Sequence, residues 1–234
     1  MGKVMLSGIV PYLVSPVSYK ANFADNTWAQ IIDACQKNAV PDTWLVGDQK
    51  NMTINGTDYA IDIIGKNHDT YSDGSGTAPL TFQLHDCYGT KYQMHTGTSN
   101  RHGWHNCNMR NVHLPSILAL MPSEVQDGIR EVNKKTSAGN KSTTLKTTAD
   151  KLFLLSEKEL RGRETYAVSG EGIEYEYYAA GNSKVKTFEG SASVWRLRSP
   201  AKDSTTDYCR VSSAGSYNRG TTNAESPIAF AFCF

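Results

Sequence analysis

The C-terminal stretch 195–234, WRLRSPAKDSTTDYCRVSSAGSYNRGTTNAESPIAFAFCF, decides our interpretation of the whole chain. Its two ends are apolar, since Trp195 and Leu197 open it and the segment 228–234 contains three phenylalanines. Between them lies a run of Ser, Thr, Asn, Asp, Tyr, Arg and Gly. Chain termini are usually poorly ordered, so apolar residues on both sides of this run predict that the fold holds it in a fixed position.

Residues 207–220, DYCRVSSAGSYNRG, have the pattern of a β-hairpin. Side chains alternate between the two faces of a strand, which predicts that Cys209 and Val211 point inward. Gly215 would lie in the turn, and Gly220 would permit another sharp change of direction. The predicted outward side chains are Tyr208, Arg210 and Ser212.

The outward side chains of this hairpin and of the adjoining segments 201–207 and 216–226 form our candidate binding surface. Tyr gives a rigid amphipathic contact, while Ser, Asn and Gly give adaptable hydrogen bonds, as in antibody loops. The two tyrosines would be contact anchors, and the two arginines would donate paired hydrogen bonds. Ordinary hydrophilic turns have the same composition, and that interpretation stays open. The candidate ligand-binding residues are Asp203, Ser204, Thr206, Asp207, Tyr208, Arg210, Ser212, Tyr217, Asn218, Arg219, Thr222 and Asn223.

The composition is that of a folded protein with one large domain or two small ones. The chain has 234 residues, of which 39% are hydrophobic and 20% are charged. Lys plus Arg number 24 and Asp plus Glu number 23, which gives a net charge of +1. This balance gives no electrostatic reason to expect nucleic-acid binding. No apolar run reaches the ~18 residues that a membrane helix needs, so we expect no membrane insertion.

Residues 1–20, MGKVMLSGIVPYLVSPVSYK, form a mildly apolar N-terminal arm. The stretch is short, is broken by Pro11 and has no clear small-residue cleavage site, so we interpret it as mature protein rather than a signal peptide. Two interpretations stay open, a plain edge strand and an oligomerisation or docking segment. We assign residues 21–234 to one ligand-binding domain, whose display region begins at about residue 195.

Several segments have clear secondary-structure patterns. Residues 25–38 have helical periodicity, with a polar cap available at residues 25–26. Asn55-Gly56 lies between two alternating runs and predicts a hairpin. Residues 80–84 predict a strand, and residues 114–129 predict a pair of helices with prolines in their first turns.

The second half of the chain predicts shorter elements. The polar segment 133–150 predicts an exposed excursion from the fold. Residues 151–160 predict a short buried strand and then a helix start, where Ser156 and Glu159 have capping-box spacing. The segment 174–178, EYEYY, alternates like an amphipathic strand. The patterns together predict an α+β fold with short antiparallel strands, two or three helices and long ordered loops, which are usually functional.

The cysteine pattern indicates thiols rather than a disulfide scaffold. An odd number without C-x-x-C spacing is typical of reduced, mostly buried thiols and not of a zinc ribbon. A bridge between Cys209 and Cys233 stays open. The five cysteines are Cys35, Cys87, Cys107, Cys209 and Cys233.

Two histidine-containing segments could in principle support chemistry. His102, His105 and Cys107 are close enough in sequence to bind a metal, and His68-Asp69 could form an acid–base pair. The first group lacks a second ligand cluster, and the second lacks a recognisable nucleophile. We therefore expect hydrogen-bonding roles for both, and we predict no catalytic residue, no metal site and no cofactor.

The segments WRLRSP (195–200), YCRVSSAGS (208–216) and PIAFAF (227–232) resemble the C-terminal signature of a bacterial and phage domain family. Further marks of that family occur in order from WLVGDQK (44–50) to EYEYY (174–178), so the resemblance covers roughly residues 26–234. The family is similar to the C-type-lectin-like domains of formylglycine-generating enzymes and of phage tropism determinants.

This resemblance implies a C-type-lectin-like fold whose C-terminal segment binds ligand. It implies a non-enzymatic receptor-binding protein of a phage tail tip or fibre, or a bacterial surface adhesin, with a host-cell surface protein or glycan as partner. In tropism determinants the ligand-binding positions can be rewritten by diversity-generating retroelements, which favour Asn, Ser, Tyr, Asp and Thr. Residues 195–234 are similar in being rich in these residue types. The resemblance also implies a homo-oligomer, for example a trimer, within a larger particle. Several copies of a weak binding site would then bind more strongly together.

Two other functions stay open. The first is a structural virion or surface assembly protein, whose loops contact only neighbouring subunits. The second is an enzyme similar to the formylglycine-generating enzymes, although Cys209 and Cys233 do not reproduce the active-site cysteine pair of that group.

Overall fold

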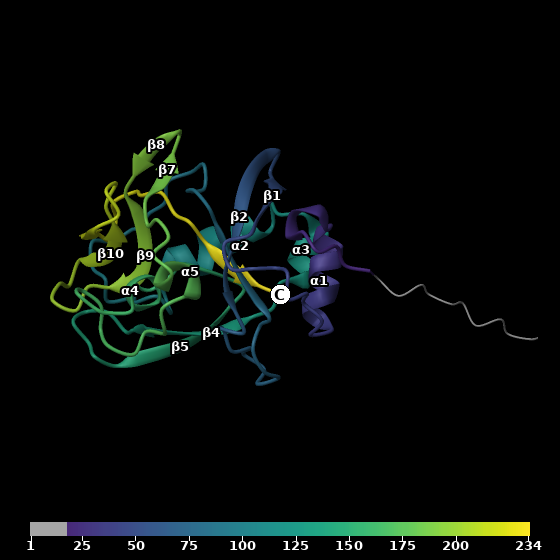
Figure 1. Ribbon diagram of the computed structural model, residues 1–234. Coiled ribbons are helices and arrows are strands. Elements are labelled where there is room, and N and C mark those ends of the chain that lie inside the picture. The colour runs from purple at the N-terminus through teal and green to yellow at the C-terminus, as the bar shows by residue number, and fades with distance from the viewer. Residues whose placement is uncertain (1–17) are drawn as a thin grey trace, which may run out of the picture.

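The computed structural model describes residues 18–234 (Figure 1). Residues 1–17, most of the predicted N-terminal arm, lie outside the described residues. The end of the arm packs with the domain, because Trp44 Nε1 donates to the carbonyl of Lys20 at 2.9 Å and the Tyr19 hydroxyl donates to Asp33 at 2.7 Å.

The largest of the sheets has five strands and holds the last strand of the chain in its interior. Its order is β1-β2-β3-β12-β6, and all neighbouring strands are antiparallel. Phe232 pairs with Phe82 on one side and with Leu152 on the other, so the last strand has partners on both edges. The strands are β1 (Gln49–Ile54), β2 (Thr57–Lys66), β3 (Leu80–Leu84), β6 (Leu152–Phe153) and β12 (Ala231–Cys233).

An aromatic cluster fixes β12 in this position. Phe82 stacks on Phe232 with ring centroids 5.3 Å apart, and Trp28 packs edge-on against Phe82 at 5.9 Å and against Phe234 at 6.1 Å. Aromatic rings bury large apolar areas, so this cluster is a strong anchor for the end of the chain. The prediction that the polar run is held from both sides is confirmed.

The hairpin predicted at Asn55-Gly56 is confirmed, and so is the strand predicted at residues 80–84. Asn55 has φ +49° and Gly56 has φ +78°, which is the backbone of a type I′ turn. The residue types on either side of the turn therefore determined this part of the fold locally.

Residues 18–234 contain five short α-helices, more than the two or three expected, and no helix long and apolar enough to cross a bilayer. The first begins after Thr27, which forms a capping box with Gln30, so the cap predicted at residues 25–26 was one or two residues early. The EYEYY segment forms a helix and not the predicted strand, with Tyr177 and Tyr178 buried. The helices are α1 (Trp28–Gln36), α2 (Leu114–Leu118), α3 (Ser123–Gly128), α4 (Glu157–Arg161) and α5 (Glu176–Ala179), with a 3-10 turn at Phe23–Asp25 and a π-helical turn at Met109–His113.

The polar segment predicted as an exposed excursion is a hairpin with one buried face. Strand β4 (Val132–Ser137) pairs with β5 (Leu145–Asp150), and Lys134, Thr136 and Asp150 are buried. The prediction was wrong because these polar side chains face partners from other segments, which the local composition does not reveal. A smaller hairpin follows later in the chain, β7 (Lys186–Phe188) with β8 (Ser191–Ser193).

The C-terminal display region folds as a three-stranded sheet in the order β11-β10-β9. The predicted hairpin is confirmed, because residues 212–216 connect two antiparallel strands. Gly220 does not turn the chain as expected; it lies inside a strand, opposite Tyr208. The strands are β9 (Trp195–Pro200), β10 (Asp207–Val211) and β11 (Tyr217–Thr221).

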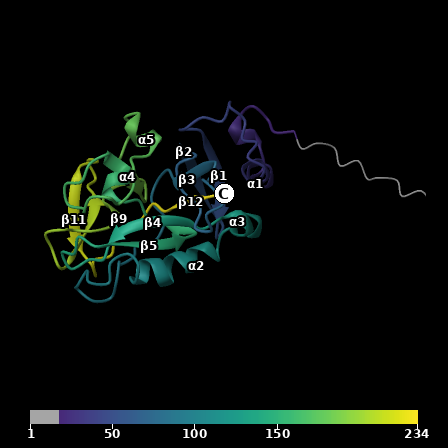
Figure 2. The same ribbon diagram turned by 90° about the horizontal axis from the view of Figure 1, so that it is seen from below.

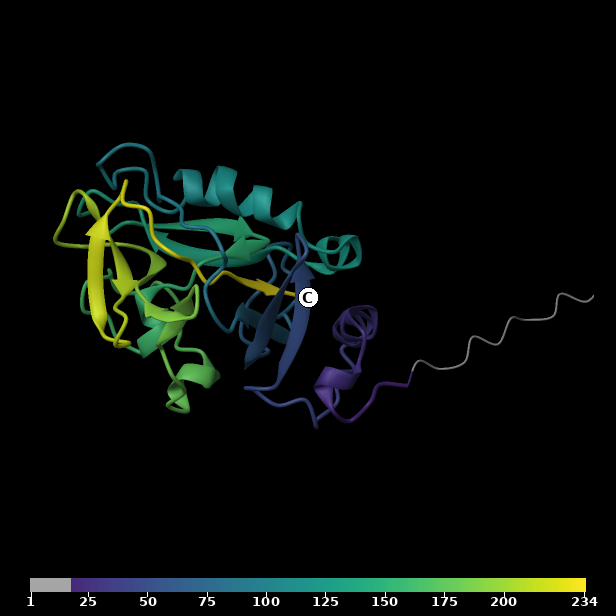
Figure 3. The same cartoon turned by 90° about the horizontal axis from the view of Figure 1, so that it is seen from above.

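The molecule is a mixed α/β fold built from small, mostly antiparallel sheets and few helices. Figure 1 shows β9 and β10 at one end and α1 at the other. Figure 2 shows β11 at the same end as β9, and α2 alongside the β4–β5 hairpin. In Figure 3 the yellow chain runs from the three-stranded sheet through the middle of the molecule to β12. One end of the domain therefore presents the display region.

Candidate functional site

Two of the predicted ligand-binding residues are buried and cannot contact a ligand at the surface. Tyr208 is 0% exposed, and its hydroxyl donates to the carbonyl of Gly103 at 2.9 Å. Thr222 is also 0% exposed, and its hydroxyl donates to the carbonyl of Thr206 at 2.6 Å. The prediction of Tyr208 as a contact anchor was wrong. Strand alternation correctly placed the side chains of Tyr208 and Cys209 on opposite faces of the strand. The distant loop at Gly103, however, covers the face of Tyr208 as well.

Several other predicted residues are at least partly exposed but bond within their own turns. Ser204 Oγ accepts from the backbone amides of Thr206 and Asp207, and Ser212 Oγ accepts from the amide of Ser216. For these side chains the alternative of ordinary hydrophilic turns describes the geometry well. Asn223 is exposed at the surface.

Three of the remaining predicted residues gather around Tyr217 with three residues that the prediction missed. The guanidinium of Arg161 lies 3.7 Å from the centre of the Tyr217 ring, and Arg163 donates to the Tyr217 hydroxyl. Cation–π contacts of this kind favour Arg over Lys and hold the ring in one orientation. We call this set the Tyr217 surface: Asp203, Asp207, Tyr217, Arg219, Arg161, Arg163 and Tyr166.

Arg219 connects the two acidic residues of the Tyr217 surface. Its guanidinium pairs with Asp203 at 2.5 Å and approaches Asp207 at 3.6 Å, and it lies 5.3 Å from the centre of the Tyr166 ring. Tyr217 and Arg219 are half-buried, so each presents part of its side chain to solvent. The segment LRGRETY at 160–166 supplies the additional residues, and only the tertiary structure places it beside β11.

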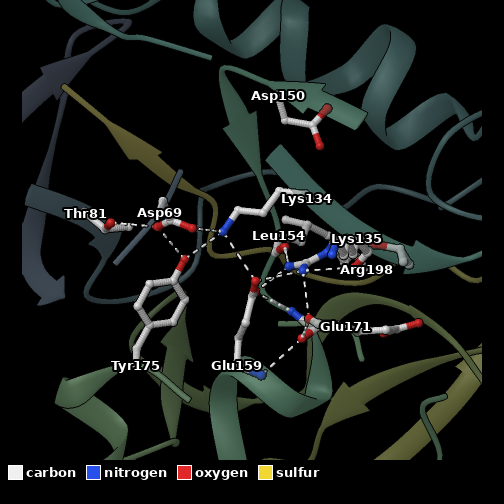
Figure 4. A network of polar contacts seen from close by, with 12 residues as sticks. Asp69, Thr81, Lys134, Lys135, Asp150, Leu154, Glu159, Glu171, Tyr175 and Arg198 are labelled. Carbon is white, nitrogen blue, oxygen red and sulfur yellow. Dashed lines mark hydrogen bonds and ion pairs between the residues drawn. The ribbon is translucent and has the colours of Figure 1, made fainter. Parts of the chain in front are cut away.

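A network of charged side chains lies buried between the sheets (Figure 4). Lys134 Nζ pairs with Asp69 and lies 3.3 Å from Glu159. Arg198 makes a bidentate pair with Glu159, and Tyr175 donates its hydroxyl to Asp69 at 2.8 Å. Buried charges are tolerated when they are paired and hydrogen-bonded in this way. The four charges balance and join segments that are distant in the sequence.

The electrostatics of this network follow from its pairing. Burial alone would raise the pKa of Glu159, but the charges of Arg198 and Lys134 hold it below its usual value. Burial would likewise raise the pKa of Asp69, and Lys134 lowers it below its usual value. Both carboxylates are therefore ionised at neutral pH.

A cavity of about 490 Å³ opens beside the network. His68 forms part of its wall and stacks on Tyr175 with ring centroids 4.0 Å apart. Asp69 accepts from Thr81, Lys134 and Tyr175 and not from His68, so the two do not form the acid–base pair considered from the sequence. The cavity is lined by His68, Asp69, Thr70, Asn133, Lys135, Thr147, Glu159, Gly170, Gly172 and Ile173.

Comparison with known proteins places most of these elements in a single family. A family model described as "Domain of unknown function (DUF6273)" matches residues 79–233, about two thirds of the chain. The chain belongs to the DUF6273 family. No curated protein and no solved structure matches the chain. The Tyr217 surface lies wholly inside the DUF6273 match, whereas Asp69 of the buried network precedes it.

One carboxyl group of the DUF6273 domain is buried without a cationic partner at its oxygens. Glu171 is 0% exposed; Oε1 accepts from the amide of Ser137 at 2.7 Å, and Oε2 has no partner. Burial raises its pKa to about 7. Glu171 therefore changes charge near neutral pH, unlike the paired Glu159.

The cysteines and the histidines near Cys107 are placed for packing, and the Nδ1 atoms of His95 and His105 are buried without a hydrogen-bond partner. All five cysteines are buried and unpaired, so Cys209 and Cys233 form no bridge. The His102 ring lies tilted against the His95 ring with centroids 3.9 Å apart, while Cys107 donates to the carbonyl of Trp104. No cluster of three metal-binding side chains occurs within residues 18–234.

Proposed function

We propose that this protein is a non-enzymatic ligand-binding protein that contacts its partner through the Tyr217 surface. The observation that carries the proposal is the position of Tyr217, half-exposed and fixed between Arg161 and Arg163. Tyr and Arg are enriched among residues that dominate binding energy, and a ring held in place loses little entropy on binding. Strand β9, at the other edge of the same sheet, is buried throughout, so the sheet that carries this surface is firmly packed.

The proposed partner is a protein or glycan on the surface of a host cell. We also propose that the fold is C-type-lectin-like, which is supported by the small antiparallel sheets and the few short helices. The proposed setting is a phage tail tip or fibre, or alternatively a bacterial cell surface, and exposed positions of the C-terminal segment are the ones that diversification would change.

A Tyr217→Ala variant tests the proposed surface. Fluorescently labelled wild-type protein is applied to a panel of bacterial cells and to a glycan array, and the binding strains or glycans are then retested with the variant. We expect binding to fall by about tenfold or more, as for a central aromatic contact, with the melting temperature nearly unchanged.

A Tyr59→Ala variant is the matched control, because Tyr59 is also half-buried but lies on β2 in the other sheet. Undiminished binding of Tyr217→Ala would contradict the proposed surface. If the wild type binds no cell or glycan and the Tyr217 surface is covered in an assembled particle, the structural assembly role is favoured instead.

We also propose that the protein forms a homo-oligomer, with the arm as one candidate assembly segment. Removal of residues 1–17 leaves the contacts of Tyr19 and Lys20 in place. Light scattering should show a lower mass for this shortened protein, and an unchanged mass would exclude the arm as the assembly segment.

A further inference from the structure

Two arginines lie on the face of the C-terminal sheet that is opposite Tyr217. Arg210 is on β10 and pairs with Arg196 of β9 on one side and with Asn218 of β11 on the other. Residues directly opposite one another in antiparallel strands share a face, whereas the adjacent pair formed by Val211 and Tyr217 uses the other face. This second face therefore has its own chemistry, independent of the Tyr217 surface.

Arg196 is a buried cation without an acidic partner. It is 0% exposed, and its Nη atoms donate to the carbonyls of Gly220 at 2.8 Å, Thr221 at 3.1 Å and Ala224 at 2.9 Å. Its Nε has no partner. Within residues 18–234 no carboxylate lies within ion-pair distance of Arg196. The carbonyls satisfy hydrogen bonds, but they leave the unit charge uncompensated.

Arg210 adds a second uncompensated charge at the same place. It is half-buried, its Nε is also buried without a partner, and it makes no hydrogen bond or ion pair with the part of the chain that the structure describes. Its guanidinium lies flat over Gly220, where an added Cβ would be 2.6 Å from Nη1. Gly220 is therefore the point where the two guanidinium groups converge, since Arg196 bonds to its carbonyl.

The neighbouring Arg198 shows how the same strand neutralises a buried arginine. Arg198 is also 0% exposed, but it is held by both oxygens of Glu159. No such carboxylate accompanies Arg196 and Arg210. Burial is the larger cause that lowers the pKa of Arg196 to about 10, and repulsion from the charge of Arg210 adds to it.

We propose that Arg210, with Arg196 behind it, binds a phosphate or sulfate group of a ligand. A phosphate monoester, which carries about two negative charges at neutral pH, accepts two parallel N–H bonds from one guanidinium and balances both cations. A sulfate ester makes the same pair of bonds but carries one negative charge, so it balances one cation. Arg196 acts through its field, which is poorly screened because the side chain is buried. The amide of Asn218, directly across from Arg210, supplies a further polar contact at the edge of the site.

Titration of the full-length protein with sodium sulfate tests this site. The arginine Nε–H signals are followed by ¹H–¹⁵N NMR, and sodium chloride at equal ionic strength is the reference. We expect saturable shifts of the Arg210 and Arg196 signals, and no shift of Arg198. Methyl phosphate and methyl sulfate, titrated separately, show which ester is preferred.

The Arg210→Gln variant should bind sulfate about tenfold or more weakly, which is the loss expected for hydrogen bonds to a charged group. Arg130→Gln is the control and should bind as the wild type does, because Arg130 pairs with Asp73 outside the C-terminal sheet. Arg210→Lys keeps the charge but loses the paired N–H donors of the guanidinium, so it should bind sulfate with intermediate affinity. The backbone amide spectrum reports whether each variant is folded. Three results would overturn the proposal. The chemical shifts could change linearly with sulfate concentration, they could change equally with chloride, or the saturable shifts of Arg196 could persist in the Arg210→Gln variant.

Discussion

At the scale of single residues, the environment of a charged side chain matters more than its type. Arg196 and Arg198 are both fully buried in β9, yet only Arg198 has a carboxylate partner. Glu159 and Glu171 differ in the same way, since Glu159 is held by Arg198 and Glu171 Oε2 has no partner. The pKa of Glu159 is therefore lowered and that of Glu171 raised. Because these pKa shifts have opposite signs, the two groups change the free energy of unfolding in opposite directions as the pH rises.

The raised pKa of Glu171 predicts a stability that falls as pH increases. Its pKa is about 7 in the folded protein against 4.5 as the ordinary value, so between these pH values the folded state binds more protons than the unfolded state. The free energy of unfolding should therefore decrease with pH across this interval, by up to about 1.4 kcal/mol per pH unit from this group. Urea unfolding at several pH values measures the slope.

Glu171→Gln is the matched variant, because the amide oxygen can still accept from Ser137 and no charge can form. The free energy of unfolding of the wild type minus that of the variant should decrease from pH 4.5 to pH 7. A difference that is independent of pH, or that rises, would contradict the assigned environment of Glu171.

At the scale of elements, strand β10 has buried side chains on both of its faces. Tyr208 on one face is buried against the loop at Gly103, and Cys209 and Val211 on the other face are buried as well. An isolated hairpin would leave one face in water. Here both faces of β10 contribute to packing, while β11 at the edge of the sheet keeps its side chains partly exposed.

Tyr208 should therefore act as a core residue. We expect Tyr208→Ala to lower the free energy of unfolding by about 3–5 kcal/mol, as for other large-to-small changes of buried rings. Tyr208→Phe retains the ring and loses only the hydrogen bond to Gly103, so we expect a loss of about 1 kcal/mol. Thermal and urea unfolding distinguish the two variants, and a Tyr208→Ala protein as stable as the wild type would show that the side chain is not buried.

At the scale of the whole molecule, the charged network connects parts of the chain that the individual sheets alone would leave separate. Asp69 follows β2, Lys134 lies on β4, Glu159 on α4 and Arg198 on β9. Four distant segments thus meet at one buried point (Figure 4). Such a network stabilises one arrangement of the segments, because every alternative leaves a buried charge unpaired.

Glu159→Gln should therefore destabilise the entire domain. The change leaves the charge of Arg198 buried without its partner, and breaking a buried pair in this way costs about 3–5 kcal/mol. The urea midpoint should fall in a single transition that fluorescence and circular dichroism both detect. Glu131→Gln, at the exposed position immediately before β4, is the control and should leave the midpoint nearly unchanged. A loss below about 1 kcal/mol for Glu159→Gln would mean that the network does not hold the fold together.

The parts of the fold that could be predicted were those fixed by neighbouring residues. Asn55-Gly56 determined its own turn, because both residues accept positive φ, and Ser156 with Glu159 formed the predicted capping box. The alternation at residues 207–211 correctly separated the two faces of β10. In each case the signal lay within about four residues along the chain.

The sequence by itself determined the hairpins at Asn55-Gly56 and at residues 207–221, the first helix and the apolar anchoring of the C-terminus, because period, turn and cap signals act between close neighbours. Only the tertiary structure decided that Tyr208 is buried, that Arg161 and Arg163 reach Tyr217, and that the polar segment 133–150 has an inward face. Those outcomes depend on contacts between residues far apart in the chain. Burial and charge pairing are properties of the folded surroundings, and composition along a segment does not specify what will pack against it.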